Sequence, residues 1–77
     1  MIRVRLFAAA AEAVASKELT LVAATIGEVR ELLAARSAEA PRVLAQCAML
    51  RDGDRLEDDA RLASGDLVDV LPPFAGG

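Results

Sequence analysis

An alternation of hydrophobic and polar residues at the start of the chain predicts a strand over residues 2–7. Successive side chains of a strand point to opposite faces, so each face has its own composition. One face carries Ile2, Val4 and Leu6, and the other carries Arg3, Arg5 and Phe7. An alanine-rich stretch over residues 8–15 then predicts a short helical turn. Residues 18–22 alternate again and predict a second strand.

A helical pattern covers residues 25–36. Thr25 and Glu28 have the spacing of a capping box, which marks the start of a helix. The apolar residues recur at helical intervals and predict a stripe that packs on the core, made of Ile26, Val29, Leu32 and Leu33. Pro41 predicts a short second helix that ends at Gln46, with Val43 and Leu44 facing inward.

Turn signals divide the last third of the chain into strands. Asp52-Gly53 predicts a tight hairpin between residues 48–51 and residues 55–56. Residues 64–66, Ser-Gly-Asp, form another turn, and residues 67–71 read as the last strand. This order of elements predicts an α+β fold, a mixed sheet covered on one face by one main helix. A ubiquitin-like β-grasp roll is its compact form, although connection rules alone leave other α+β topologies open.

Composition limits the function. With 77 residues, the chain predicts a single domain with an aliphatic core, because only Phe7 and Phe74 are aromatic. The formal net charge of −3 argues against nucleic-acid binding. Without histidine, and with Cys47 as the only cysteine, the chain lacks the residues for a zinc site, a histidine-based triad or an internal disulfide. The absence of an internal disulfide fits a cytoplasmic protein or a fold that needs no disulfide. The adjacent acids Asp58 and Asp59 are interpreted as solvated surface, so no metal site is expected.

The first sixteen residues also imitate a secretory signal peptide, with Ala13-Val14-Ala15 before Ser16 as a cleavage site. Glu12 interrupts the apolar stretch, however, and residues 2–6 alternate as a strand does. We therefore interpret this region as part of the fold and expect no membrane segment.

The chain closes with the segment Leu71-Pro72-Pro73-Phe74-Ala75-Gly76-Gly77. Pro72 lacks an amide hydrogen, so it stops the last strand. The flexible tail over residues 72–77 could extend roughly 20 Å from the body of the domain. Gly76 and Gly77 have no side chains, so the terminal carboxylate could enter a channel too narrow for other residues.

With this ending, the chain resembles the MoaD/ThiS family of sulfur carriers. The resemblance spans the opening strand "IRVRLF", the alanine-rich turn, the capped central helix, "SGDLVDVLPP" and "PPFAGG". The ending is the most specific part, and the rest is compatible with it. The chain departs from many relatives at "RDG", residues 51–53, where they carry Asn-Gly, but Asp-Gly serves the same turn.

The resemblance implies a cycle of sulfur transfer that ends in molybdopterin synthesis. An ATP-dependent adenylyltransferase of the ubiquitin-activating type would adenylate the Gly77 carboxylate, and a sulfurtransferase would supply the sulfur for a thiocarboxylate. The large subunit of molybdopterin synthase would then receive the inserted tail, which consists of Pro72, Pro73, Phe74, Ala75, Gly76 and Gly77. No bound cofactor is expected, since the activating enzyme uses the ATP, and the chain supplies a reacting group and no catalytic side chain.

The same fold implies that the first and last strands lie parallel and adjacent. Alternation then places Phe7, Leu67 and Leu71 on the face away from the helix, as a partner interface, while Val68 and Val70 face the core.

Three other functions stay open: a sulfur carrier for thiamine or cysteine synthesis, a ubiquitin-like modifier, and a plain interaction domain. Cys47 is interpreted as a small buried hydrophobic residue, and Lys17 is the only lysine on which a modifier could build chains.

Overall fold

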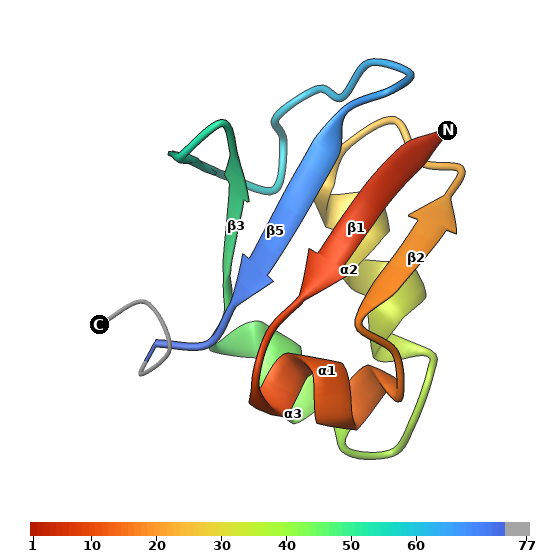
Figure 1. The fold of residues 1–77 in the computed structure, drawn as a ribbon, viewed down its shortest axis with the longest axis vertical. Coiled ribbons are helices and arrows are strands. Elements are labelled where there is room, and N and C mark those ends of the chain that lie inside the picture. The colour runs from red at the N-terminus through yellow and green to blue at the C-terminus, as the bar shows by residue number, and fades with distance from the viewer. Residues whose placement is uncertain (74–77) are drawn as a thin grey trace.

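The computed structural model describes residues 1–73, and Phe74, Ala75, Gly76 and Gly77 lie outside the described residues. It shows a five-stranded mixed sheet in the order β2-β1-β5-β3-β4 (Figure 1). The strands are β1 (Ile2–Leu6), β2 (Glu18–Leu21), β3 (Ala48–Arg51), β4 (Asp54–Leu56) and β5 (Leu67–Leu71). The helices are α1 (Ala9–Val14), α2 (Ile26–Ala34) and α3 (Ala40–Ala45). This is the predicted α+β, ubiquitin-like fold.

The first and last strands, β1 and β5, form the parallel centre of the sheet, as predicted. Arg3 lies opposite Leu67 and Arg5 lies opposite Asp69. All other pairs of neighbouring strands are antiparallel. The chain therefore leaves the sheet from a central strand, beside the end of β1.

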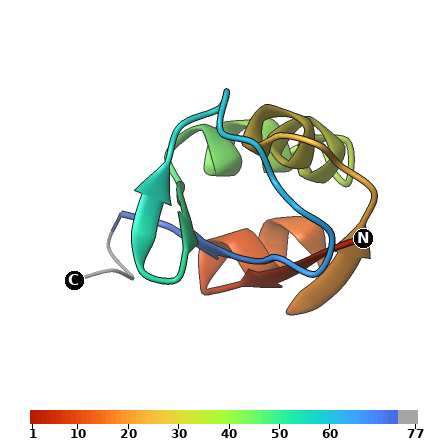
Figure 2. The ribbon, with the colours of Figure 1, turned by 90° about the horizontal axis from the view of Figure 1, so that it is seen from above.

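The helices α2 and α3 lie on one side of the sheet, and α1 lies beyond the end of β1 (Figure 1). Figure 2 shows α2 and α3 as a layer above the strands, and α1 follows the end of β1 and packs against α3. No helix within residues 1–73 is long and apolar enough to cross a membrane.

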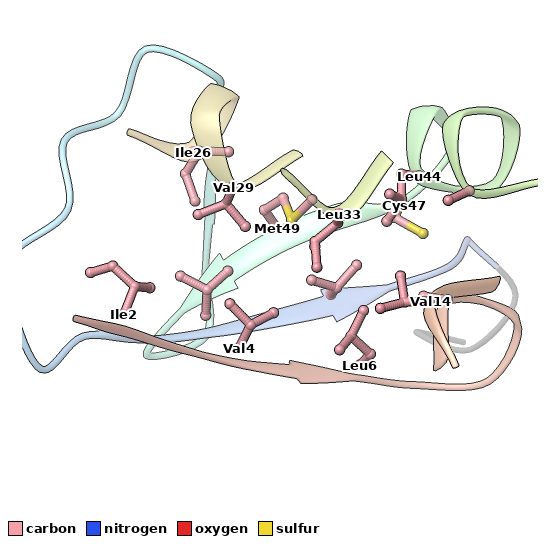
Figure 3. Packing of buried hydrophobic residues seen from close by; sticks show 14 residues of the cluster. Ile2, Val4, Leu6, Val14, Ile26, Val29, Leu33, Leu44, Cys47 and Met49 are labelled. Atoms are coloured by element: carbon pink, nitrogen blue, oxygen red, sulfur yellow. The ribbon is translucent and has the colours of Figure 1, made fainter. Parts of the chain in front are cut away.

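Aliphatic side chains fill the space between the sheet and the helices (Figure 3). The sheet contributes alternate residues from its central strands, including Val4, Met49, Val68 and Val70, all 0% exposed. The helices contribute Ile26, Val29, Leu33 and Leu44, which are also fully buried. The predicted inward face of β1 and the inward Val68 and Val70 are thus confirmed.

The N-terminus of α2 is capped as the capping-box spacing predicts. The amide of Glu28 donates to Thr25 Oγ1 at 3.2 Å, and the Glu28 carboxylate accepts from the amide of Ala24 at 2.8 Å. The predicted apolar stripe is wrong at one position, because the Leu32 side chain is 44% exposed.

Arg30 attaches α2 to neighbouring segments on the side of the helix away from Leu32. Its guanidinium donates to the carbonyl oxygens of Leu44 and Cys47 and pairs with Asp58 Oδ1 at 3.1 Å. Gly27 allows the same loop to approach, since a Cβ there would lie 3.2 Å from the Asp58 carbonyl oxygen. The first turn of α2 is therefore fixed to the loop that follows β4.

The predicted turns are also present. Asp52 and Gly53 adopt positive φ values of 54° and 82°, as the tight hairpin between β3 and β4 requires. Before β5, Asp66 Oδ2 accepts from the amide of Ala63 at 2.8 Å and pairs with Arg51 at 2.9 Å. These two contacts lower the pKa of the Asp66 carboxyl.

Candidate functional site

The end of β5 positions the segment that the sequence marks as reactive. β5 ends at Leu71, immediately before Pro72, as predicted. Pro72 is buried and Pro73 is exposed. The sequence predicts an extended tail that starts at Pro72. This start is wrong by one residue, because Pro72 is buried against the domain and Pro73 is the first exposed residue after β5. The predicted site residues Phe74, Ala75, Gly76 and Gly77 lie outside the described residues.

Phe7 and Leu71 lie together where the chain emerges. The amide of Phe7 donates to the carbonyl oxygen of Val70 at 3.2 Å, which places the ends of β1 and β5 side by side. The Phe7 side chain is 38% exposed, and Leu71 is half-buried. Since Leu6 and Val70 point to the core, Phe7 and Leu71 occupy the outer face of the sheet. The predicted placement of these two residues is confirmed.

Leu67 shares the outer face but is separated from that pair by charges. Asp69 lies between Leu67 and Leu71 on the same face, and it accepts two hydrogen bonds from Arg5, at 2.7 and 3.0 Å. This two-point contact raises the pKa of the Arg5 guanidinium. The three predicted interface residues therefore do not form one apolar surface, and only Phe7 and Leu71 meet at the exit of the tail.

A hollow beside the exit brings together apolar and polar side chains that the sequence analysis missed. Ala48 of β3 lies opposite Leu71 in the sheet, and Leu50 lies opposite Asp69. Together with Gln46, Arg55 and residues 71–73, they line a hollow of about 470 Å³. Ala48 and Leu50 alternate with the buried Met49, which predicts that both face outward. Only the pairing of β3 with β5 shows that this outward face lies beside Leu71. We call Phe7, Ala48, Leu50 and Leu71 the exit patch.

Cys47 is buried, as predicted, and only 4% exposed. Its Sγ donates a hydrogen bond to the Val43 carbonyl oxygen at 3.3 Å. Burial raises the pKa of the thiol, against a smaller opposing effect of Arg30. Because the thiolate is the reactive form, this cysteine is poorly suited to carry sulfur.

The described part of the chain offers a surface and no reaction centre. Within residues 1–73, no three carboxylate or thiol groups converge as a metal site requires. The exit patch is a partly exposed apolar area, in which Phe7 is exposed and the other three residues are half-buried, and it is bordered by the Arg5–Asp69 ion pair. Apolar areas with polar borders mark protein–protein contacts. The exit patch is therefore a candidate contact surface for another protein.

Comparisons with known proteins identify a matching family and several structures with a similar fold. A model described as the ThiS family matches residues 4–77. The crystal structure of SAMP1 from Haloferax volcanii has a TM-score of 0.79 and 28% identity, and the match covers 99% of this chain and 98% of that one. A second crystal structure, titled H. volcanii small archaeal modifier protein 1, has a TM-score of 0.78 and 25% identity, with coverages of 94% and 95%.

A third similar structure is a complex of subunits 1 and 2 of the molybdopterin-converting factor from Helicobacter pylori 26695. One of its chains matches with a TM-score of 0.72 and 22% identity, over 99% of this chain and 97% of that one. At this identity, the likeness shows the shared fold. No curated protein sequence matches the chain.

Proposed function

The chain belongs to the ThiS family of ubiquitin-like sulfur carriers, and on this basis we propose that it donates sulfur for molybdopterin synthesis. In this proposal it is the small subunit of a cytoplasmic molybdopterin synthase, and the Gly77 carboxylate is the group that carries the sulfur. The observation that carries the proposal is the segment "PPFAGG", which follows the central strand β5 directly.

The terminal carboxylate needs activation before it can hold sulfur. An ATP-dependent adenylyltransferase would join the Gly77 carboxylate to AMP and release pyrophosphate. Sulfur at the oxidation level of sulfide, delivered by a sulfurtransferase, would then displace AMP and leave a thiocarboxylate. The two glycines support this route, because a chain without side chains fits through a narrow channel to another protein's active site.

The large subunit of the synthase is the proposed receiver of the sulfur. In the Helicobacter pylori complex, a chain of this fold is found together with subunit 2. For the present chain, the exit patch supports a partner at this position, because Phe7 and Leu71 lie beside the base of the tail. The tail would enter the large subunit while the exit patch is covered by it.

The test is the intact mass of the protein after incubation with an activating enzyme, ATP and a sulfur source. We expect an increase equal to the replacement of one oxygen by sulfur, located by fragmentation at Gly77. A matched variant without Gly76 and Gly77 should stay unlabelled. Its free energy of unfolding should change by less than about 0.5 kcal/mol, as for other exposed positions. Label on Cys47, or no label with an enzyme that charges related carriers, contradicts the proposal.

A ubiquitin-like modifier is the second candidate, and the similarity to small archaeal modifier protein 1 favours it specifically. In that case the Gly77 carboxylate would form isopeptide bonds with lysines of other proteins. Such adducts are distinguished from a thiocarboxylate by mass spectrometry of digests, because a lysine of the target then carries the C-terminal glycines. Lys17 is the only lysine in this chain that could accept a second copy.

A further inference from the structure

The outer edge of β2 offers backbone groups that the described part of the chain leaves mostly without hydrogen-bond partners. The strand pairs only with β1, and the amide of Leu6 donates to the carbonyl oxygen of Lys17 at 2.9 Å. In antiparallel pairs, hydrogen-bonded and non-hydrogen-bonded positions alternate. The polar backbone groups of Leu19 and Leu21 therefore face β1, and those of Glu18, Thr20 and Val22 point away from the sheet.

Few of these outward groups have a partner. Ser16 Oγ donates to the Glu18 carbonyl oxygen at 2.9 Å. Across residues 1–73, the structure gives no other partner to the outward N–H and C=O groups of Thr20 and Val22. Figure 1 shows this edge lying open beside β1. The backbone of an extended peptide can form hydrogen bonds with these alternating N–H and C=O groups. Edge strands of sheets commonly bind peptides in this way.

The side chains around the edge are apolar on the helix side, whereas the outer face also carries Thr20 and the Arg3–Glu18 ion pair at 3.6 Å. Val22 is 79% exposed, and on the helix side Leu19 and Leu21 are half-buried. Leu32 of α2 reaches the same side. Successive helix residues turn by about 100°, so Leu32 lies almost opposite Arg30, whose guanidinium contacts Leu44 and Cys47 beside β3.

The other edge of the sheet is different and provides a comparison within the molecule. β4 has only three residues, two of which are Asp54 and Arg55. It is flanked by Asp52 and Glu57. Charged residues and short length are the usual protection of sheet edges against pairing. The β2 edge has a charge at Glu18, but Thr20 and Val22 leave its remaining length uncharged.

We propose that the β2 edge binds an extended segment of a partner protein as a sixth strand of the sheet. Alternate side chains of this segment would be aliphatic and would cover Leu32 on the helix side. The start of β2 lies near the exit patch, because Glu18 and Phe7 line one hollow. Thr20 and Leu21 instead lie opposite Arg3 and Ile2, at the start of β1 and away from Phe7. One protein can then hold the carrier by β2 while another receives the tail.

Short linear peptides selected from a displayed random library against the full chain are the probe. We expect the selected peptides to carry aliphatic residues at alternate positions. Binding should slow hydrogen exchange of the Thr20 amide, because this N–H points to the added strand. Selection of no peptide, or peptides whose amide shifts gather around Phe7 and Leu71, overturns the proposal.

Two variants make the test specific. Thr20→Pro removes the outward amide hydrogen and leaves the bonds to β1 in place, so it should weaken peptide binding about five-fold or more. Thr20→Val keeps this amide and should bind as the parent does. Leu32→Ser should weaken binding by about ten-fold through lost apolar burial, and it keeps the proposal testable if Thr20→Pro does not fold.

Further outcomes complete the test. The Leu50→Ala variant should bind the peptides with unchanged affinity, since β1 and β5 separate Leu50 in β3 from the β2 edge. Equal binding by Thr20→Pro and Thr20→Val, with both variants folded, overturns the added strand. A concentration-dependent dimer that buries the β2 edge, seen by analytical ultracentrifugation and abolished by Leu32→Ser, also overturns it, because the occupant is then a second copy.

Discussion

The two faces of the sheet contribute differently to the protein. The inner face, represented by Val4, Met49 and Val68, is fully buried against the helices. The outer face carries the exposed Phe7 and the Arg5–Asp69 ion pair. Burial of apolar side chains dominates folding, whereas exposed ion pairs add little. The inner face therefore supplies the stability, whereas the outer face is the one proposed for recognition, and neighbouring residues should respond differently to substitution.

The largest expected effect is on the inner face. Met49→Ala removes a fully buried side chain and should lower the free energy of unfolding by about 2–5 kcal/mol. Leu50→Ala is the matched control, since Leu50 is the next residue of β3 and lies half-buried on the outer face. It should lose less than half as much. Urea denaturation measures both, and equal losses would remove the contrast between the faces.

On the outer face, Phe7→Ala should affect binding and leave the fold intact. Burial of such a side chain in an interface contributes on the order of 1.5–3 kcal/mol, so the complex with the large subunit should weaken by about ten-fold or more. Titration calorimetry of the purified pair measures this. Val22→Ala, which changes a more exposed residue, should not weaken the complex. A strong loss of stability in Phe7→Ala alone would place Phe7 in the core.

A smaller effect is expected for the ion pair on the outer face. Asp69→Asn breaks the contact between Asp69 and Arg5. The free energy of unfolding should fall by no more than about 1 kcal/mol, because both side chains are partly exposed to water and salt screens the pair. Thermal and urea unfolding at low and high salt test this. A larger loss would show that the outer face also stabilises the fold.

The smallest effect concerns Asp66, at the start of β5, and it appears only in acid. Its pKa is lowered in the fold by the Ala63 amide and Arg51, relative to an unfolded value of about 3.9. The stabilisation is fully present above the unfolded value and is lost as the pH falls through the folded pKa. The unfolding midpoint of the parent should therefore decline below about pH 4, and that of Asp66→Asn should decline less. Parallel declines in both proteins would contradict this role of Asp66.

The pattern of residues predicted most of the fold because local signals were consistent there. Alternation in β1, the Thr25 cap and the Asp52-Gly53 turn all depend on nearby residues, and each is present in the structure. The adjacency of β1 and β5 came from the resemblance to a family, since periodicity contains no information on which strands pair. Phe7 could then be placed correctly on the outer face.

The errors occur where burial depends on distant elements. Leu32 fits a helical stripe but is 44% exposed, because periodicity alone does not show how wide a face of the helix the rest of the fold covers. Pro72 was expected in an extended tail and is buried against the domain. Ala48 and Leu50 were missed as members of the exit patch because their pairing with β5 is a long-range contact.

The parallel pairing of β1 and β5 also determines how the domain responds to mechanical force. The two strands are the first and the last of the sheet and lie side by side. If the N-terminal end of β1 is held and the C-terminal end of β5 is pulled, the two strands are forced to slide along each other. Hydrogen bonds such as Arg3 N to Asp66 O and Phe7 N to Val70 O are then loaded together in shear, and they cannot open one after another. Forced unfolding follows the unfolding rate, so an unfoldase motor or optical trap that pulls in this direction meets the domain where it is mechanically strongest.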